Sequence, residues 1–304
     1  MTSTTSAADG VFVGIPCYNR AEGLAQTIRC LRQQTHRNWV ALISDNASPD
    51  PAVRAVAEEA CAKDPRFVYH RHSENTGPSH NFHFVMMAAD QPFYMWASDD
   101  DLWEPEFIAT NLKELADSPN AQMSCCTADL INRFGRTVRT MDSFSRFKST
   151  GDRYADVKYF LKDPEILGKA NLFYGIFRTN ALRKCMTTFW HDIGLQSHGA
   201  DVVFLYGFVC RNPITAHGAV HLHKRIDTAK SSKRLLRHPR TYKVTPRSEF
   251  ESYVQRHRSV SSTSEFAELA ELTLRKRQSE RYLYSIPVLN WFLNDQNTER
   301  APAA

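Results

Sequence analysis

The stretch Phe93-Tyr94-Met95-Trp96-Ala97-Ser98-Asp99-Asp100-Asp101 joins an apolar, aromatic run to three consecutive aspartates. The apolar run has the length and composition of a buried strand. Carboxylates gathered at the end of a strand repel one another and lose solvation, and a hard divalent cation relieves both costs by taking their oxygens as ligands. Because Mg²⁺ and Mn²⁺ complete their shells with water and phosphate oxygens, the stretch predicts a site for a metal-bound diphosphate. The alternative is a solvated acidic turn in which an aspartate caps the following helix.

Upstream of the aspartates, strand-like and helix-like segments alternate. Apolar runs predict strands at 11–15, 38–44, 67–70 and 93–97, and helical periodicity predicts helices at 21–34, 52–62 and 81–89. This alternation is typical of a parallel sheet flanked by helices. The loops that follow the strands, at 16–20, 45–50, 75–79 and 98–101, should then open at one edge of the sheet, where such folds bind ligands.

Beyond residue 105 the alternation loosens. We expect a helix at 106–117, strands near 122–132, 137–141 and 172–177, a buried helix at 201–210 and a charged helix at 265–284. The segment 224–258 carries about eleven basic residues against three acidic ones. It is interpreted as a solvated, partly mobile basic segment, with binding to anionic lipid or to a polyanionic acceptor as the alternative.

Composition sets broad bounds on the protein. A chain of 304 residues with 42% hydrophobic content can build a substantial core, and a net charge of +5 is compatible with an anionic substrate, a membrane surface or nucleic acid. The seven cysteines lack paired metal-ligand spacing and favour a reducing compartment. No signal peptide or membrane-spanning stretch is recognisable. We therefore expect a cytoplasmic protein, either soluble or peripheral at the inner face of the membrane.

Four short motifs occur in order on the predicted loops. They are Val13-Gly14-Ile15-Pro16-Cys17-Tyr18-Asn19-Arg20, Ser44-Asp45-Asn46-Ala47-Ser48-Pro49-Asp50, Glu74-Asn75-Thr76-Gly77 and Ser98-Asp99-Asp100-Asp101. Over roughly residues 11–225 the chain thereby resembles the family 2 glycosyltransferases, which are inverting enzymes of the GT-A fold. The motifs match that family's P-x-Y-N loop, D-[DN]-x-S-x-D loop, N-x-G turn and D-x-D motif. Each motif is short, but four in the right order would rarely coincide by chance.

The resemblance implies an α/β GT-A fold, with a Rossmann-like, mostly parallel central sheet flanked by helices and a C-terminal helical appendage. The implied organisation is a disordered lead-in at 1–10, a nucleotide-sugar-binding half at 11–105, an acceptor-binding half at 106–225 and a basic helical appendage at 226–304. The implied reaction moves a sugar from a nucleotide-diphosphate sugar, UDP before dTDP or GDP, to a hydroxyl of a glycan or lipid-linked acceptor in cell-surface polysaccharide synthesis. Mn²⁺ or Mg²⁺ would be the cofactor.

The resemblance also implies roles for residues of the donor site. The nucleotide-sugar contacts would be Pro16, Tyr18, Asn19, Arg20, Asp45, Asn46, Asn75, Gly77, Ser98, Asp99 and Asp100. Among them, Asp45 would accept a hydrogen bond from an imide N–H of uracil or thymine, and Asp99 would contact the ribose. The family often has an acid where this chain has Ser98.

For the metal, the resemblance implies Asp101 as a ligand and His223 as the residue that completes the shell. The sequence His221-Leu222-His223 places two imidazoles on one face of a strand, and His217 is equally available. Three successive residues cannot all face one point, so at least one of the three acids should point elsewhere or cap the following helix.

Displacement at an anomeric carbon requires a base for the acceptor hydroxyl, separate from the Lewis acid at the leaving group. Asp201 is the candidate base, because it begins an apolar helix in the part of the chain where the family places its acid. The alternative is that Asp201 only caps that helix. Asp192 is the second candidate for the base, and the neighbouring His198 is interpreted as a solvent-facing residue.

Other functions remain open at this point. A nucleotidyltransferase or sugar-nucleotide hydrolase would use the same arrangement of carboxylates, divalent cation and phosphate, but the chain has no Gly-rich phosphate loop. A catalytically silent relative could bind nucleotide sugar as a scaffold. The basic C-terminal third could bind nucleic acid, but it contains no recognised binding pattern, so the expected partners are a nucleotide-sugar donor and a glycan or lipid-linked acceptor, with no nucleic acid. A homo-oligomer and peripheral membrane contact are left open.

Overall fold

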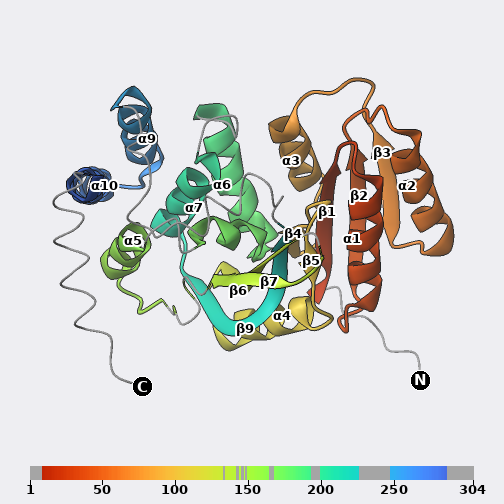
Figure 1. Ribbon diagram of the computed structural model, residues 1–304. Coiled ribbons are helices and arrows are strands. Elements are labelled where there is room, and N and C mark those ends of the chain that lie inside the picture. The colour runs from red at the N-terminus through yellow and green to blue at the C-terminus, as the bar shows by residue number, and fades with distance from the viewer. Residues whose placement is uncertain are drawn as a thin grey trace, which may run out of the picture.

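The structure, a computed structural model, describes residues 9–132, 134–141, 144, 147, 149–163, 168–192, 199–225 and 247–285. Helices flank a central sheet whose strand order is β3-β2-β1-β4-β8-β6-β9-β5, with β7 paired to β6 (Figure 1). None of the helices in these residues is long and apolar enough to cross a lipid bilayer. Of the lead-in predicted at 1–10, residues 1–8 lie outside the described residues, whereas the Gly10 carbonyl accepts a hydrogen bond from Phe93 N–H at 3.1 Å.

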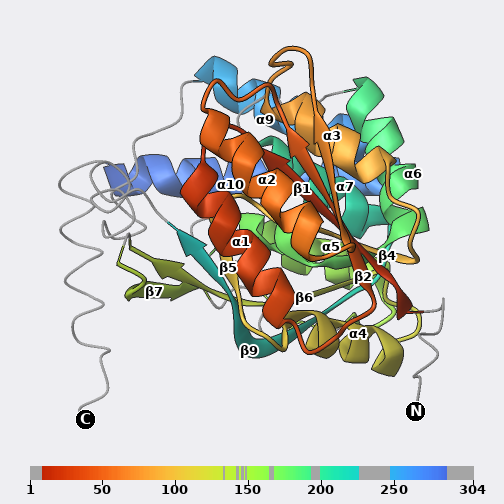
Figure 2. The same ribbon diagram turned by 90° about the vertical axis from the view of Figure 1, so that its right-hand side faces the viewer.

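The N-terminal half of the sheet is parallel, as expected. Its strands are β1 (Val11–Cys17), β2 (Trp39–Asp45), β3 (Phe67–Arg71) and β4 (Phe93–Trp96), and its helices are α1 (Ala21–Gln33), α2 (Pro51–Lys63) and α3 (Pro78–Met87). Figure 2, viewed from the side of α1 and α2, shows these two helices in front of the strands. The third helix begins at Pro78, earlier than predicted, because proline suits the first turn of a helix.

Beyond β4 the sheet becomes mixed, so the expectation of a mostly parallel sheet holds only for its first half. The strands here are β5 (Leu102–Trp103), β6 (Met123–Ile131), β7 (Thr137–Met141), β8 (Ile176–Arg178) and β9 (Ile214–Arg225). β8 runs antiparallel to both β4 and β6, while β6 and β9 are parallel. The strand predicted at 172–177 is shorter than expected, because a 3-10 turn, η3 (Lys169–Tyr174), precedes it.

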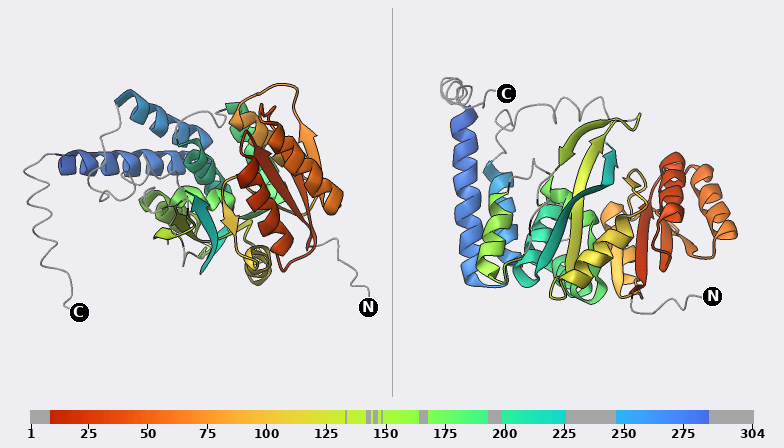
Figure 3. Two further views of the ribbon diagram at one scale, coloured as in Figure 1. Left: turned by 45° about the vertical axis from the view of Figure 1, so that its right-hand side comes forward. Right: turned by 90° about the horizontal axis from the view of Figure 1, so that it is seen from below.

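With the exception of α4, the remaining helices gather at one end of the molecule. They are α4 (Phe107–Asp117), α5 (Arg153–Lys162), α6 (Thr179–Asp192), α7 (Ala200–Arg211), α9 (Arg247–Val260) and α10 (Ser264–Ser285). Apart from α4, which lies beneath the sheet, they lie away from β3 and α2, and α10 is at the far end (Figures 1 and 3). The helix α9 overlaps the end of the basic segment 224–258, so residues 247–258 of that segment are helical, and residues 226–246 lie outside the described part of the chain.

Two cores lie on opposite faces of the sheet, and the alternation of side chains along each strand assigns residues to them. In β1, Val11 and Val13 pack with α1 and α2, whereas Phe12 packs on the other face with α3 and α7 residues. In β4, Met95 joins the first core and Trp96 the second. Because both faces of β1 and β4 are covered in this way, polar side chains are placed after the carboxyl ends of the strands, where the aspartates follow.

Candidate active site

The four motif loops meet at the carboxyl edge of the parallel strands, as the sequence predicted. Tyr18 N–H donates to Asp99 Oδ2 at 3.1 Å, and Asn19 N–H donates to Ser48 Oγ at 2.9 Å. A third link joins the loop at 45–50 to the loop at 75–79, because Asn46 Nδ2 donates to Asn75 Oδ1 at 2.9 Å. Segments up to 81 residues apart in sequence are thus fastened side by side at this edge.

Two of the three aspartates face Arg20. Its guanidinium lies 3.2 Å from Asp99 Oδ1 and 2.5 Å from Asp100 Oδ2, and Ser98 Oγ donates to Asp100 Oδ1 at 2.6 Å. Asp99 is only 6% exposed, and burial raises its pKa to about 6, against the opposing effects of the Tyr18 N–H and the Arg20 charge. The side chain of Asp100 keeps 32% of its surface exposed. Asp99 is thus buried, and only Asp100 and Arg20 of this group reach the solvent.

Asp101 lies apart from the other two. It is 1% exposed, forms an ion pair with Lys224, and accepts a hydrogen bond from Arg225 N–H at 3.1 Å. Burial raises the pKa of Asp101, while the Lys224 charge opposes that shift. The Lys224 ammonium also lies 3.6 Å from the centroid of the Tyr174 ring. Both oxygens of Asp101 are thus satisfied inside the protein.

The predicted metal pair of Asp101 and His223 is not formed. Leu102 pairs with His223 across the antiparallel strands β5 and β9, so Asp101 lies opposite Lys224 and His223 points to the other face of the sheet. There His223 Nε2 lies 2.7 Å from Glu104 Oε1. Within the described ranges, no group of three or more His, Cys, Asp or Glu side chains is arranged to hold a metal, and His217 and His221 pack against each other instead.

A divalent cation fits Asp99 and Asp100 better than Asp101. Mg²⁺ and Mn²⁺ are typically held by one or two carboxylates, with water and substrate phosphate oxygens as the other ligands. Asp100 supplies a part-exposed carboxylate, and the buried Asp99 lies beside it with the exposed Arg20 side chain as their shared partner, whereas Asp101 is paired with Lys224 inside the protein. The consecutive acids therefore divide into two at the ligand side and one inside the fold, in agreement with the expectation that they could not all face one point.

The predicted nucleobase contacts also differ in access. Asp45 is 0% exposed: its Oδ1 accepts from Ser48 N–H at 2.8 Å, and its Oδ2 accepts from Tyr69 OH at 2.9 Å and from Arg71 at 2.7 Å. Burial acts to raise the pKa of Asp45, but these hydrogen bonds outweigh it and lower the pKa. Asp45 anchors its loop in this structure, and a direct contact with a base is not supported.

Of the other residues predicted to contact the donor, some are buried in the fold and others are accessible to a ligand. Asn46 is 2% exposed, Pro16 is buried within β1, and Gly77 adopts the left-handed φ of 87° that starts α3. Asn19 has a φ of 58°. Tyr18, in contrast, is 44% exposed, and its backbone N–H donates to Asp99. Of the nucleobase contacts implied by the resemblance, only Tyr18 has a substantially exposed side chain.

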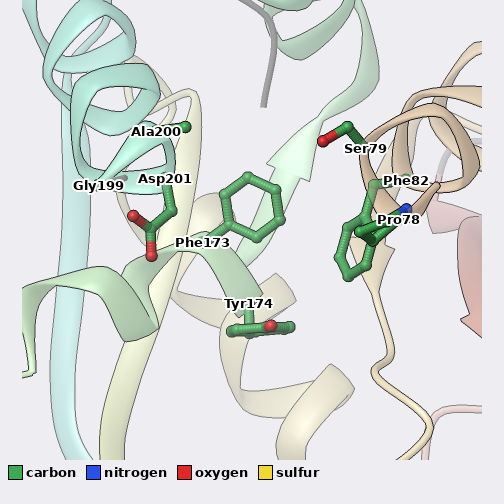
Figure 4. A pocket seen from close by; sticks show the side chains of 8 residues that line it. All are labelled: Pro78, Ser79, Phe82, Phe173, Tyr174, Gly199, Ala200 and Asp201. Atoms are coloured by element: carbon green, nitrogen blue, oxygen red, sulfur yellow. The ribbon is translucent and has the colours of Figure 1, made fainter. Parts of the chain in front are cut away.

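A pocket of about 250 Å³ lies between the N-terminal ends of α3 and α7. Figure 4 shows Asp201 on one side, Ser79 and Phe82 on the other, and Phe173 and Tyr174 between them. The remaining lining residues are Pro78, Gly199 and Ala200. Three aromatic side chains and Asp201 thus line the same pocket, and two of the rings come from η3, where the sequence predicted the start of a strand.

Asp201 lies in the first turn of α7, and the residue at the N-cap is Gly199. Asp201 Oδ1 accepts from Val202 N–H at 2.8 Å, and the residue lines the pocket (Figure 4). The interpretation of Asp201 as the N-cap residue is therefore wrong. Asp192 is the last residue of α6, and His198 lies outside the described residues.

The pocket and the acidic edge are adjacent. Tyr174 lines the pocket, and the Lys224 ammonium lies between its ring and Asp101, next to Asp100 in the chain. Lys224 was not identified from the sequence, because no local motif distinguishes it from the other basic residues that follow it.

Comparison with known proteins gives a consistent result. The family model described as "Glycosyl transferase family 2" matches residues 12–182, more than half of the chain. Uncharacterized glycosyltransferases of Rickettsia conorii and Rickettsia felis are each 29% identical over 133 residues, which is 44% of this chain and 21% of theirs. The chain thus matches about a fifth of the length of these curated relatives.

The fold also has counterparts among solved structures. Residues 1–349 of S. aureus TarS, solved with UDP, superpose with a TM-score of 0.62 at 15% identity, covering 89% of this chain and 72% of that one. The same region of TarS solved with UDP-GlcNAc gives a TM-score of 0.61 at 15% identity, with coverage of 89% and 73%. At this identity the likeness concerns the fold, and it confirms the predicted GT-A fold class.

Proposed function

The chain belongs to glycosyl transferase family 2, and on this premise we propose that it transfers a sugar from a nucleotide-diphosphate sugar to an acceptor hydroxyl, with inversion at the anomeric carbon. The observation that carries the proposal is the pocket in which Asp201 faces three aromatic rings, next to the edge that holds Asp99 and Asp100. UDP is the first candidate nucleotide, because TarS, which shares the fold, was solved with UDP and with UDP-GlcNAc.

The donor would bind along the carboxyl edge of the parallel strands. Tyr18 offers an exposed aromatic face for the base, and Asp99 and Asp100 are the residues that would hold Mn²⁺ or Mg²⁺. When bound, such a cation stabilises the negative charge that develops on the leaving diphosphate. Arg20 carries several N–H donors at the same place and can turn from the carboxylates to phosphate oxygens, whose geometry a guanidinium matches.

The acceptor would enter the pocket. Phe82, Phe173 and Tyr174 can pack against the apolar face of a sugar ring and exclude water, as aromatic side chains do in ligand sites. Asp201 would take the proton from the acceptor hydroxyl as its oxygen bonds to the anomeric carbon, and the bond to the diphosphate breaks on the opposite side. These rings support a glycan or a lipid-linked glycan as the acceptor; its place in cell-surface polysaccharide synthesis remains part of the proposal.

The test combines donor binding with turnover. Thermal shift against UDP, dTDP and GDP sugars, each with and without Mn²⁺, should reveal one donor class that stabilises the fold by mass action. With that donor, Asp201→Asn should lower nucleoside diphosphate release at least about a hundredfold and leave donor affinity unchanged, because general-base catalysis contributes about 10²–10⁴ in rate.

The control for Asp201→Asn is Glu22→Gln, which changes an exposed acid in the first turn of another helix, α1. It should leave both quantities unaltered. Undiminished release by Asp201→Asn would remove Asp201 as the base, and a parent protein that binds donor without any release would indicate a catalytically silent relative.

A further inference from the structure

The helix α9 runs alongside α7 and approaches it closely at two glycines. A side chain at Gly199 would lie 2.9 Å from the Tyr253 ring, and one at Gly207 would lie 3.1 Å from Val260. Contacts at these distances are tighter than an added side chain normally makes, so a larger residue at either position would have to displace its neighbour. Residue numbers increase in both helices from the first contact, Gly199 with Tyr253, to the second, Gly207 with Val260. The two helices therefore run parallel, with one contact at the N-terminal end of α7 and the other in its second half.

At the C-terminal end of α7, hydrogen bonds hold the helix in place. Arg211 donates to the Val260 carbonyl at 2.6 Å, Ser262 Oγ donates to the Cys210 carbonyl at 3.1 Å, and Tyr206 OH donates to the Phe266 carbonyl at 2.7 Å. This end of α7 is therefore fixed by polar contacts with the turn between α9 and α10.

At the N-terminal end, the contact between α9 and α7 is made by the Tyr253 ring. Gly199 is the N-cap of α7, has a left-handed φ of 71°, and accepts the first hydrogen bond of the helix from Val203 N–H at 3.0 Å. The Tyr253 ring lies over this glycine, and its own position is supported by the His257 ring at 4.4 Å between centroids. Asp201 follows two residues later, in the same turn.

We propose that Tyr253 is a positioning residue for Asp201, so that the C-terminal helices complete the candidate active site. The reason is that glycine has the largest conformational freedom of any residue, and an N-cap without a side-chain hydrogen bond frays easily. The ring packs on Gly199 in the first turn of α7, and Asp201 of the same turn lines the pocket (Figure 4). This inference rests on the proposed function in one respect, the role of Asp201 as the base.

The test uses a matched pair of substitutions on one helix in the 304-residue chain. Tyr253→Ala removes the contact at the N-terminal end of α7, and Val260→Ala removes the contact at Gly207, away from Asp201. In hydrogen exchange, Tyr253→Ala should speed exchange of the amides of residues 203–205 by about tenfold or more, whereas Val260→Ala should act on the second half of α7. Tyr253→Phe keeps the ring and should exchange like the parent.

Turnover gives the second readout. With a donor that passes the thermal-shift test, Tyr253→Ala should lower kcat by about ten- to a hundredfold with donor KM unchanged, because a small displacement of a catalytic group is enough for such a loss. Tyr253→Phe should restore kcat, and Val260→Ala should keep it. Unchanged exchange at 203–205 in Tyr253→Ala would overturn the proposal, as would equal losses of kcat in Tyr253→Ala and Val260→Ala.

The two hypotheses can fail separately. Full activity of Asp201→Asn would remove the proposed base but leave the exchange result for Tyr253→Ala to decide whether the ring holds the first turn. Conversely, a loss of activity in Asp201→Asn together with normal exchange and kcat in Tyr253→Ala would retain the base and reject the positioning role.

Discussion

Asp101 is the residue whose surroundings depart most from its implied role. It is 1% exposed and its charge is balanced by Lys224, which also packs on the Tyr174 ring. A buried ion pair adds little net stability, but removal of one partner leaves an uncompensated charge in the interior. We therefore interpret the pair as a structural contact that holds β9 to the acidic loop, and not as part of a metal site.

We expect Lys224→Met to lower the free energy of unfolding by about 3–5 kcal/mol, the usual cost of breaking a buried pair. The double variant Asp101→Asn/Lys224→Met should recover a large part of that loss, because no charge then remains buried. Urea denaturation of the parent, both single variants and the double variant measures this as a cycle. A single variant within about 1 kcal/mol of the parent would contradict the structural role of the pair.

Asp99 should make cation binding depend on pH. Its pKa is raised to about 6 by burial, so it takes up a proton as the pH falls through 6 and loses the charge that would attract Mn²⁺. Mn²⁺ affinity in the presence of UDP should be constant from pH 8 to 7 and fall below pH 6. Titrations at several pH values test this, and Asp99→Asn should bind weakly with no such dependence.

The same shift has an opposite consequence for stability. Since the folded protein binds this proton more tightly than the unfolded chain, the contribution of Asp99 to the free energy of unfolding decreases as the pH rises from about 4 to 6 and is constant above that. Asp99→Asn should remove this slope from the pH dependence of urea denaturation. An unchanged slope would mean that another group titrates in this range.

The helix α1 supports the acidic loop by direct backbone contact. A side chain at Gly23 would overlap the Asp99 carbonyl oxygen, and Thr27 Oγ donates to the Ser98 carbonyl at 2.9 Å one turn later. The loop that carries Asp99 and Asp100 is thus held by one face of a neighbouring helix. Its position depends on how closely that helix can approach.

Gly23→Ala should therefore destabilise the protein, although glycine-to-alanine changes inside helices usually stabilise by about 1 kcal/mol. The overlap with the Asp99 carbonyl should outweigh that gain and cost about 1–3 kcal/mol, as overpacking does elsewhere. Donor affinity should fall as well. Thermal denaturation with Glu22→Ala, at the adjacent exposed position, as a control decides the sign, and a stabilised Gly23→Ala would refute the contact.

The sheet is continuous across the boundary at residue 105 that the motifs suggest. Phe93 and Tyr94 of β4 pair with Arg178 and Phe177 of β8, and β8 pairs in turn with β6. Trp96 stacks on Phe173 with 4.2 Å between the ring centroids. The residues before and after this boundary therefore share one sheet, and both parts of the chain contribute to the cores on its two faces.

A fragment of residues 9–105 should accordingly fail to fold by itself. It would leave β4 as an unpaired edge and expose Tyr94 and Trp96, which are both 0% exposed in the whole chain. Gel filtration and calorimetry should show aggregation or no cooperative transition, in contrast to the full chain. A monomeric fragment with a sharp transition would show that the halves are independent domains.

The sequence by itself determined the parallel half of the sheet, its helices and the four loops at its edge. Strand and helix periodicity are local properties, and the turn residues at Asn19, Asn46 and Gly77 mark the loops without reference to distant parts of the chain. The same local signals predicted α7 and placed Asp201 near its start.

The tertiary structure alone decided which polar groups remain available. Asp101 is paired with a lysine 123 residues away, and Asp45 is hydrogen-bonded by the neighbouring strand. The aromatic residues that share the pocket with Asp201 come from η3 and α3. Tyr253 reaches Gly199 from a helix outside the family match. Burial and pairing of a charge depend on contacts between distant segments, so periodicity and motifs, which describe neighbours along the chain, do not contain them.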